Sequence, residues 1–202
     1  MKSKTPGSWS DVKACLTPMD RTGLVDVIRS LYEANSSNRR FLHARFVPAA
    51  GALEQYRSLV QTAVFPDPFS QRPVRLRDAA CAITEYKRST GDLAGVVDLL
   101  LTFAEAGTEQ AADLGYGDDA YFGALERKIN DALSMLDRLP AEALVEAEAR
   151  LTRLGDYANR IGWGYGDFLA GVAGRLSKRR RTPPAKSINT RSNTRMEPTA
   201  RN

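Results

Sequence analysis

The chain contains a single histidine, His43, which is the side chain best suited to proton transfer near neutral pH. It lies in the basic run RRFLHAR, between Arg39 and Arg45. A catalytic histidine works with a nucleophile or an orienting carboxylate within hydrogen-bond reach, and the neighbouring sequence offers neither. We therefore interpret His43 as a surface or packing residue, and we predict no catalytic residue.

Groups that commonly bind metals or form disulfides are also sparse. Cys15 and Cys81 are the two cysteines, neither belongs to a CxxC pair, and neither lies near His43 in sequence. We interpret both thiols as small, buried apolar side chains in a reducing compartment. Asp118 and Asp119 could ligate a cation, but the calcium-loop spacing is not matched, so we expect them to cap a helix. The sequence predicts no metal and no cofactor.

The most unusual local sequence is GWGYGD, residues 162–167. Its glycines permit a backbone with positive φ, and Trp163 and Tyr165 carry large amphipathic rings suited to a ligand or a protein partner. The alternative, which we favour, is an interhelical turn whose rings fill one end of the core and whose Asp167 caps the next helix. A pocket at this turn needs the distant segment 116–121 beside it. The candidate interaction residues are Trp163, Tyr165, Asp167, Tyr116, Asp118 and Tyr121.

The net charge of +5 is unevenly distributed along the chain. Residues 1–90 hold 14 basic and 8 acidic side chains, for a net charge of +6. Residues 91–177 hold 7 and 15, for −8, and residues 178–202 hold 8 and 1, for +7. The region before residue 178 is therefore mildly acidic, and the overall basicity does not by itself indicate nucleic-acid binding.

Two stretches of the chain are rich in arginine, and each has two possible interpretations. Arg72, Arg75 and Arg77 could bind phosphate or an acidic partner, but we favour solvation or pairing with the acidic segment 91–177. The run KRRR, residues 178–181, could contact nucleic acid nonspecifically, or it could be a solvated helix end favoured by the helix dipole. We expect nucleic-acid contact, if any, through the tail.

The elements that must position these residues are all predicted to be helices. Apolar residues recur at helical spacing, as in Leu24, Val27, Ile28 and Leu31, and no segment alternates as a strand does. After a short helix that ends at residue 16, we expect helices over 20–34, 39–47, 50–64, 74–88, 93–106, 120–139, 141–154 and 167–177. The pattern leaves open whether 107–116 continues the helix that begins at residue 93.

Short turns between successive helices predict an all-α fold, an irregular antiparallel array of about eight or nine helices arranged as solenoid-like helical hairpins. The helix over 93–106 is apolar on nearly every side, so we expect it to be the most buried. We divide the chain into a flexible N-terminus (1–8), an α-helical domain (9–177) and a disordered basic tail (178–202). No apolar run is long enough for a membrane span and no secretory signal precedes the domain, which favours the cytoplasm.

Several segments occur together in a fixed order: VDVIRSLYEANSSNRRFLHARF, VFPDPF, DAACAITEYKR, ADLGYGDDAYFGALERKINDAL and RIGWGYGD. In this order and spacing the chain resembles a bacterial family of uncharacterised proteins, domain of unknown function 6155, over about residues 9–177. The resemblance implies the helical architecture and assigns no catalytic residue. The basic segment after residue 177 is a departure from the family pattern.

With helix pairs throughout, no catalytic set and opposite charge in its two halves, the chain is expected to be a non-enzymatic scaffold or adaptor. It would bind a protein partner through a concave helical face or the GWGYGD turn. One alternative is nonspecific nucleic-acid association through the basic tail and the basic N-terminal half. Another is small-molecule binding near the turn. The sequence indicates neither the partner nor the oligomeric state.

Overall fold

A computed structural model describes residues 7–47, 51–162 and 164–181, and the predicted all-α fold is confirmed across this part of the chain. Apart from the single-turn α9 and two 3-10 turns, nine α-helices follow one another, and no strand occurs among these residues. The predicted tail beyond residue 181 and the side chain of Trp163 lie outside the described residues.

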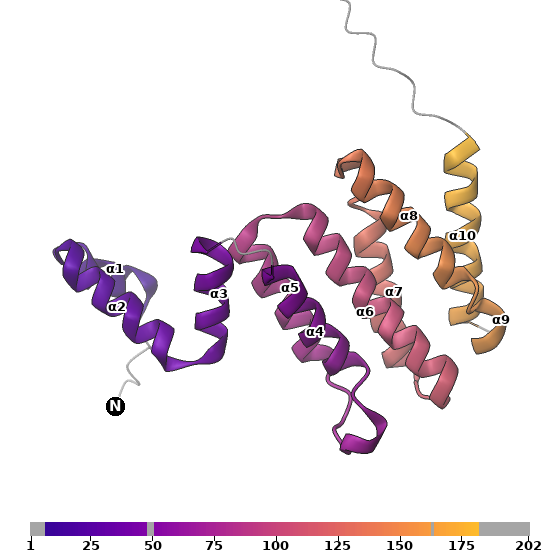
Figure 1. The fold of residues 1–202 in the computed structure, drawn as a ribbon, viewed down its shortest axis with the longest axis horizontal. Coiled ribbons are helices and arrows are strands. Elements are labelled where there is room, and N and C mark those ends of the chain that lie inside the picture. The colour runs from indigo at the N-terminus through magenta and orange to yellow at the C-terminus, as the bar shows by residue number, and fades with distance from the viewer. Residues whose placement is uncertain (1–6, 48–50, 163, 182–202) are drawn as a thin grey trace, which may run out of the picture.

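The helices divide into an arm and a body (Figure 1). The arm consists of α1 (Trp9–Leu16), α2 (Arg21–Ala34) and α3 (Ser36–Phe46), and it projects from one side of the molecule. Within it, α2 packs on α3, and α3 in turn packs on the body. The helices of the body are α4 (Ala52–Val64), α5 (Leu76–Thr90), α6 (Leu93–Leu114), α7 (Asp119–Leu133), α8 (Ala141–Gly155), α9 (Ala158–Ile161) and α10 (Tyr165–Arg181).

Helix α6 lies at the centre of the body and packs against α4, α5, α7 and α8. Its buried residues surround the helix axis from Gly95 to Ala111, so the prediction that this helix is the most buried is confirmed. The helix continues through Gly107, where an added Cβ would lie 2.4 Å from a methyl carbon of Leu125. Close packing of α7 on α6 therefore depends on the missing side chain. Among the described helices, none is both long and apolar enough to span a membrane.

Several helix ends differ from those predicted. Helix α3 begins at Ser36 rather than residue 39, because the Asn35 side chain accepts a hydrogen bond from the Asn38 N–H at 2.8 Å and caps it. Helix α7 ends at Leu133, and a 3-10 turn, η2 (Leu136–Arg138), replaces its predicted last turn. Helix α10 starts before Asp167 and extends through Arg181, so the first residues assigned to the basic tail are helical.

Candidate functional site

The aromatic residues near the GWGYGD turn do meet the distant segment after α6. Ring centroids are 5.1 Å apart for Tyr116 and Tyr121, 5.7 Å for Tyr121 and Phe122, and 5.1 Å for Phe122 and Tyr165. Phe168 extends this row at 6.2 Å from Tyr165. The structure therefore brings three of the predicted site residues, Tyr116, Tyr121 and Tyr165, into one row of rings, as a pocket at this end would require.

The inner side chains of this row, Tyr121 and Tyr165, are buried and tightly packed. The Tyr165 hydroxyl lies 2.7 Å from the buried Thr108 Oγ1, and the Tyr121 hydroxyl donates to the Gly107 carbonyl at 2.9 Å. Burial raises the pKa of both tyrosines above the ordinary value. Both rings fill the end of the core, and Tyr116, 46% exposed, is the member that a partner can reach. An interaction role for the row stays a prediction.

The two carboxylates of the predicted site serve helix ends. Asp118 accepts a hydrogen bond from the Tyr121 N–H at 2.8 Å and caps α7. Asp167 was expected to cap the last helix, but it lies inside the first turn of α10, where it accepts from the Gly164 N–H at 3.3 Å. The difference arises because Gly164 adopts φ of 76° and turns the chain, so the helix starts directly after it.

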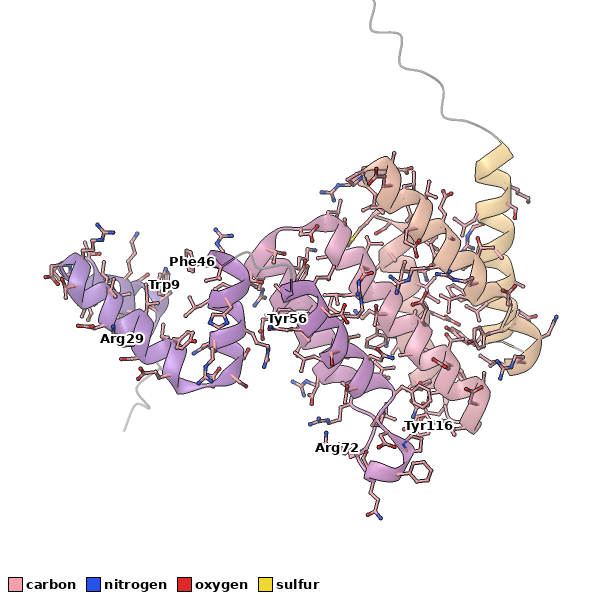
Figure 2. The ribbon with its side chains drawn as sticks, in the orientation of Figure 1. Trp9, Arg29, Phe46, Tyr56, Arg72 and Tyr116 are labelled. Carbon is pink, nitrogen blue, oxygen red and sulfur yellow. The ribbon has the colours of Figure 1, made fainter. Side chains whose placement is uncertain are left out.

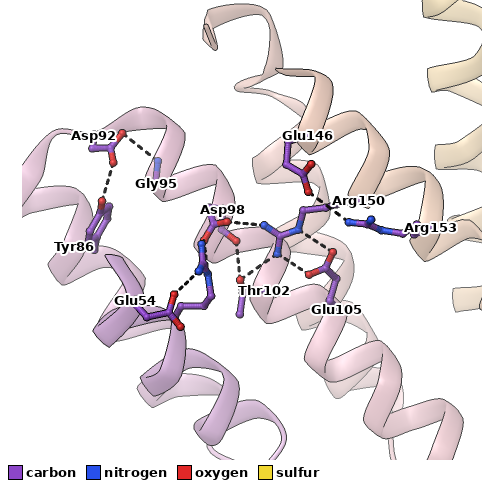
Figure 3. Close-up of polar contacts among 11 residues, drawn as sticks. Glu54, Tyr86, Asp92, Gly95, Asp98, Thr102, Glu105, Glu146, Arg150 and Arg153 are labelled. Carbon is purple, nitrogen blue, oxygen red and sulfur yellow. Dashed lines mark hydrogen bonds and ion pairs between the residues drawn. The ribbon is translucent and has the colours of Figure 1, made fainter. Parts of the chain in front are cut away.

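The densest polar cluster in the described residues links α4, α6 and α8 (Figure 3). Arg150 of α8 donates to Asp98 at 2.7 Å, to both carboxylate oxygens of Glu105 at 2.9 and 2.5 Å, and to Thr102 at 3.1 Å. Arg57 of α4 binds the other oxygen of Asp98 at 3.0 Å. Burial opposes the charge on Arg150, but Glu105 and Asp98 outweigh it, and the pKa of Arg150 is raised.

The geometry of this ion cluster fits a role in helix packing better than a role in catalysis. Each of its arginines and carboxylates already contacts a neighbour of opposite charge, and the cluster includes no histidine or cysteine. The adjoining cavity, bordered by Asp98 and Arg150, encloses about 240 Å³. That volume is below the roughly 300 Å³ at which small-molecule pockets begin. We interpret the cluster as a clamp that fixes α8 to α6 and α4.

A wider groove of about 610 Å³ follows the surfaces of α4 and α5, and three arginines border it. Arg75 pairs with Asp78 of its own helix at 3.3 Å, and Arg40 lies 3.5 Å from Glu85. Thus Arg75 finds an acidic neighbour within α5 rather than in segment 91–177. Arg72 makes no ion pair with any described residue. The groove is of mixed charge, which gives nucleic acid no strong footprint there.

No group of three or more His, Cys, Asp or Glu side chains in residues 7–47, 51–162 and 164–181 has a geometry that could hold a metal ion. Cys15 and Cys81 are both exposed and unpaired, so the expectation that they are buried is wrong. Cys15 lies on a helix whose residues are hardly covered, and Cys81 lies on the groove side of α5.

The most distinctive surface of the molecule is on the arm. Helices α1 and α2 have no buried residue, although both carry apolar stripes. Nine large apolar side chains of residues 9–47 are between 37% and 70% exposed, and all but Met19 form what we call the apolar arm surface: Trp9, Val12, Leu24, Val25, Ile28, Leu31, Phe46 and Val47. Figure 2 shows Trp9 and Phe46 across the space between α1 and α3, with Arg29 on the far side of α2.

The bend between α2 and α3 is fixed by polar contacts. The Tyr32 hydroxyl lies 3.0 Å from His43 Nε2, and the Arg39 guanidinium stacks over the Tyr32 ring at 5.3 Å. The Asn38 side chain donates to the Leu31 carbonyl at 2.8 Å. His43 thus helps to hold α2 against α3. Its contact with the Tyr32 ring is sufficient to account for its position.

The arm is attached to the body at Glu85 of α5. This carboxylate accepts hydrogen bonds from the Tyr56 hydroxyl of α4 at 2.6 Å and from the Ser37 hydroxyl of α3, and it pairs with Arg40 of α3. Burial and the bond to Glu85 raise the pKa of Tyr56. Arg45 adds a hydrogen bond from α3 to the Ser89 carbonyl at 3.4 Å. These contacts set the direction in which the arm projects.

The sequence predicts that Leu24, Val27, Ile28 and Leu31 share one helical face, but it does not predict what covers that face. The helical period shows that one face of α2 is apolar, and it carries no signal for what lies against that face. The structure exposes three of the four side chains.

In comparisons with known proteins, the sequence matches no family model, and neither a curated protein nor a solved structure is similar to it.

Proposed function

We propose that this chain is a non-enzymatic helical scaffold that binds the apolar face of a helical protein partner through its apolar arm surface. The single observation that carries the proposal is the exposure of that surface on helices whose bend and attachment are fixed by specific contacts. An amphipathic helix with one uncovered apolar face is the usual form of a helix-binding surface.

The size of the surface supports a partner. Taking about 200 Å² for a fully exposed large side chain, the eight residues present roughly 800 Å² of apolar surface to water. The largest apolar patch on a typical monomer is about 300 to 600 Å². At about 25 cal/mol per Å², covering the surface contributes up to roughly 20 kcal/mol before the costs of association. A free energy of this size favours the state in which a partner covers the apolar arm surface.

The composition of the surface points in the same direction. Trp9 and Phe46, which are 70% and 69% exposed, are of the aromatic type that is enriched at the centres of protein interfaces. The charged side chains of α2, such as Asp26 and Arg29, lie on the opposite face of the helix, as its 3.6-residue period dictates. An apolar face whose centre lacks charged side chains is typical of a protein-binding surface.

We also propose that the chain belongs to the helical family that it resembles. The segment VDVIRSLYEANSSNRRFLHARF covers most of α2 and all of α3, so the arm would then be a shared feature of the family. Substituting that segment's apolar face in a second protein with the same ordered motifs, and finding the same loss of association, is the test that links the two proposals.

A photo-crosslinking amino acid placed at two exposed apolar positions tests the function. Leu31, 52% exposed, lies on the arm, and Val145, 66% exposed, lies on α8 of the body. In cells of the source organism we expect a discrete adduct from position 31 and none from position 145. The adduct should disappear when Leu24→Asp is added, and the protein identified in it should rebind the purified chain. No adduct at position 31, or an equal adduct at 145, would overturn the proposal.

A further inference from the structure

Resting on the proposed function, we infer that the partner of the apolar arm surface is the same surface on a second copy of this chain, in a two-fold dimer. A stable interface of standard size buries about 800 Å² per partner, which matches the roughly 800 Å² of apolar side chain that the arm exposes. A two-fold interface uses one patch twice and therefore needs no second surface on the chain.

The body of the same chain does not cover this surface. Helix α3 is held to α4 and α5 by the contacts of Glu85 with Tyr56, Ser37 and Arg40, and α1 and α2 extend beyond it away from the body (Figure 1). Only α3 of the arm packs substantially on the body, and neither α1 nor α2 does so. Since the described residues of the chain leave this surface uncovered, we assign its cover to another molecule.

The stripe on α2 is complementary to itself. Leu24 and Leu31 stand equally far from the midpoint between Val27 and Ile28. An antiparallel copy of α2 centred there places Leu24 against the partner's Leu31 and Val27 against the partner's Ile28. Residues spaced three and four apart share one helical face, so all four meet along one seam. Pairs of similar volume pack without cavities or overlap.

Electrostatics do not oppose the pairing. Residues 9–47 hold six basic and four acidic side chains, a net charge of +2, so two copies repel each other only weakly. The acidic segment 91–177 and the basic run 178–181 belong to the body, outside the arms that meet. The apolar contacts along the seam can therefore determine whether two copies associate.

The mass of the full-length chain in solution tests the inference. We expect twice the chain mass of 22.2 kDa by light scattering at micromolar concentration. Ile28→Asp and Leu31→Asp should each halve the measured mass while circular dichroism stays unchanged, because both positions are exposed in the single chain. Val145→Asp, which also replaces an exposed apolar residue, should remain dimeric.

Two outcomes overturn the dimer, and they separate it from the proposed function. If the wild-type chain has the mass of one copy, the dimer is wrong, and an adduct between position 31 and another protein would leave the scaffold function standing. If a dimer forms but both aspartate variants keep its mass, another surface joins the copies. If the purified chain forms a dimer that depends on the arm but position 31 gives no adduct in cells, not even between two copies, the surface is unoccupied in cells; this outcome contradicts the proposed function and leaves the dimer of the purified chain standing.

A disulfide experiment tests the antiparallel seam directly. In a background of Cys15→Ser and Cys81→Ser, a chain with Leu24→Cys is mixed with a chain with Leu31→Cys. We expect a disulfide between unlike chains to form faster than one between like chains. Equal rates, or faster formation between like chains, would overturn the antiparallel arrangement.

Discussion

The Tyr56 hydroxyl of α4 donates a 2.6 Å hydrogen bond to Glu85 of α5, on the same carboxylate that holds Ser37 and Arg40 of α3. One side chain thus joins three helices, two from the body and one from the arm. The carboxylate is 18% exposed, so its contacts are shielded from water and from salt. The orientation of the arm depends on it more than on any apolar contact within α1 or α2.

Glu85→Ala should destabilise the attachment of the arm. It leaves the Tyr56 hydroxyl without its acceptor and the Arg40 guanidinium without its ion-pair partner, which costs about 2 to 3 kcal/mol in urea unfolding. Hydrogen exchange should quicken in α3 and remain unchanged at the centre of α6. Tyr56→Phe, which removes one donor only, should cost about 1 kcal/mol. Equal quickening in α6 would contradict an attachment role.

Arg150→Met should cost about 2 to 3 kcal/mol, because Asp98 and Glu105 lose a shared and mostly buried partner. Arg153→Met is the matched control, since Arg153 and Glu146 are 64% and 66% exposed and their pair should be worth at most about 0.5 kcal/mol. Chemical denaturation of both variants gives the comparison. Similar small losses in the two would show that the cluster does not clamp α8.

Stability should fall at alkaline pH. The pKa values of Tyr56, Tyr86, Tyr121 and Tyr165 are raised from the ordinary 10.0, with burial the largest cause in each. The folded chain therefore holds these protons more tightly than the unfolded chain, so the stabilisation is complete below about pH 10 and is lost as the pH rises above it. Urea unfolding between pH 8 and about pH 11 checks the slope, which Tyr165→Phe should reduce. A flat profile would contradict the burial of these hydroxyls.

Gly166→Ala and Gly171→Ala should have opposite effects, although both glycines lie in α10. A Cβ at Gly166 would lie 2.4 Å from the Ala158 carbonyl oxygen, so alanine there should cost about 1 to 3 kcal/mol. A Cβ at Gly171 meets nothing within 4 Å, and alanine there should stabilise the helix by about 0.5 to 1 kcal/mol. Melting temperatures of the pair give the result, and an unchanged or raised melting temperature for Gly166→Ala would contradict the packing of α10 on α9.

The sequence predicted elements well where local signals decide them. The end of α2 at Ala34 and the start of α8 at Ala141 agree with the structure because a polar cap and a proline mark them. The start of α3 was missed because Asn35 both ends α2 and caps α3, so no further loop residue separates the two helices.

The aromatic row was predicted in part and the apolar arm surface was not. Tyr121 and Tyr165 could be named from their unusual neighbours, yet their burial and the bond of Tyr165 to Thr108 depend on how α6, α7 and α10 meet. For Ile28 and Leu31 the spacing predicts a shared face. Their exposure depends on the absence of a covering helix, which is a property of the whole fold rather than of the local sequence.

Apart from Ala44, every side chain of the buried core comes from Tyr56 or later in the chain. Substitutions at Leu24, Ile28 or Leu31 would therefore leave the free energy of unfolding of the body nearly unchanged. Selection for a stable body would not preserve these residues, whereas the association that we propose would. Comparing substitution rates on the two faces of α2 across natural variants would then report on binding alone.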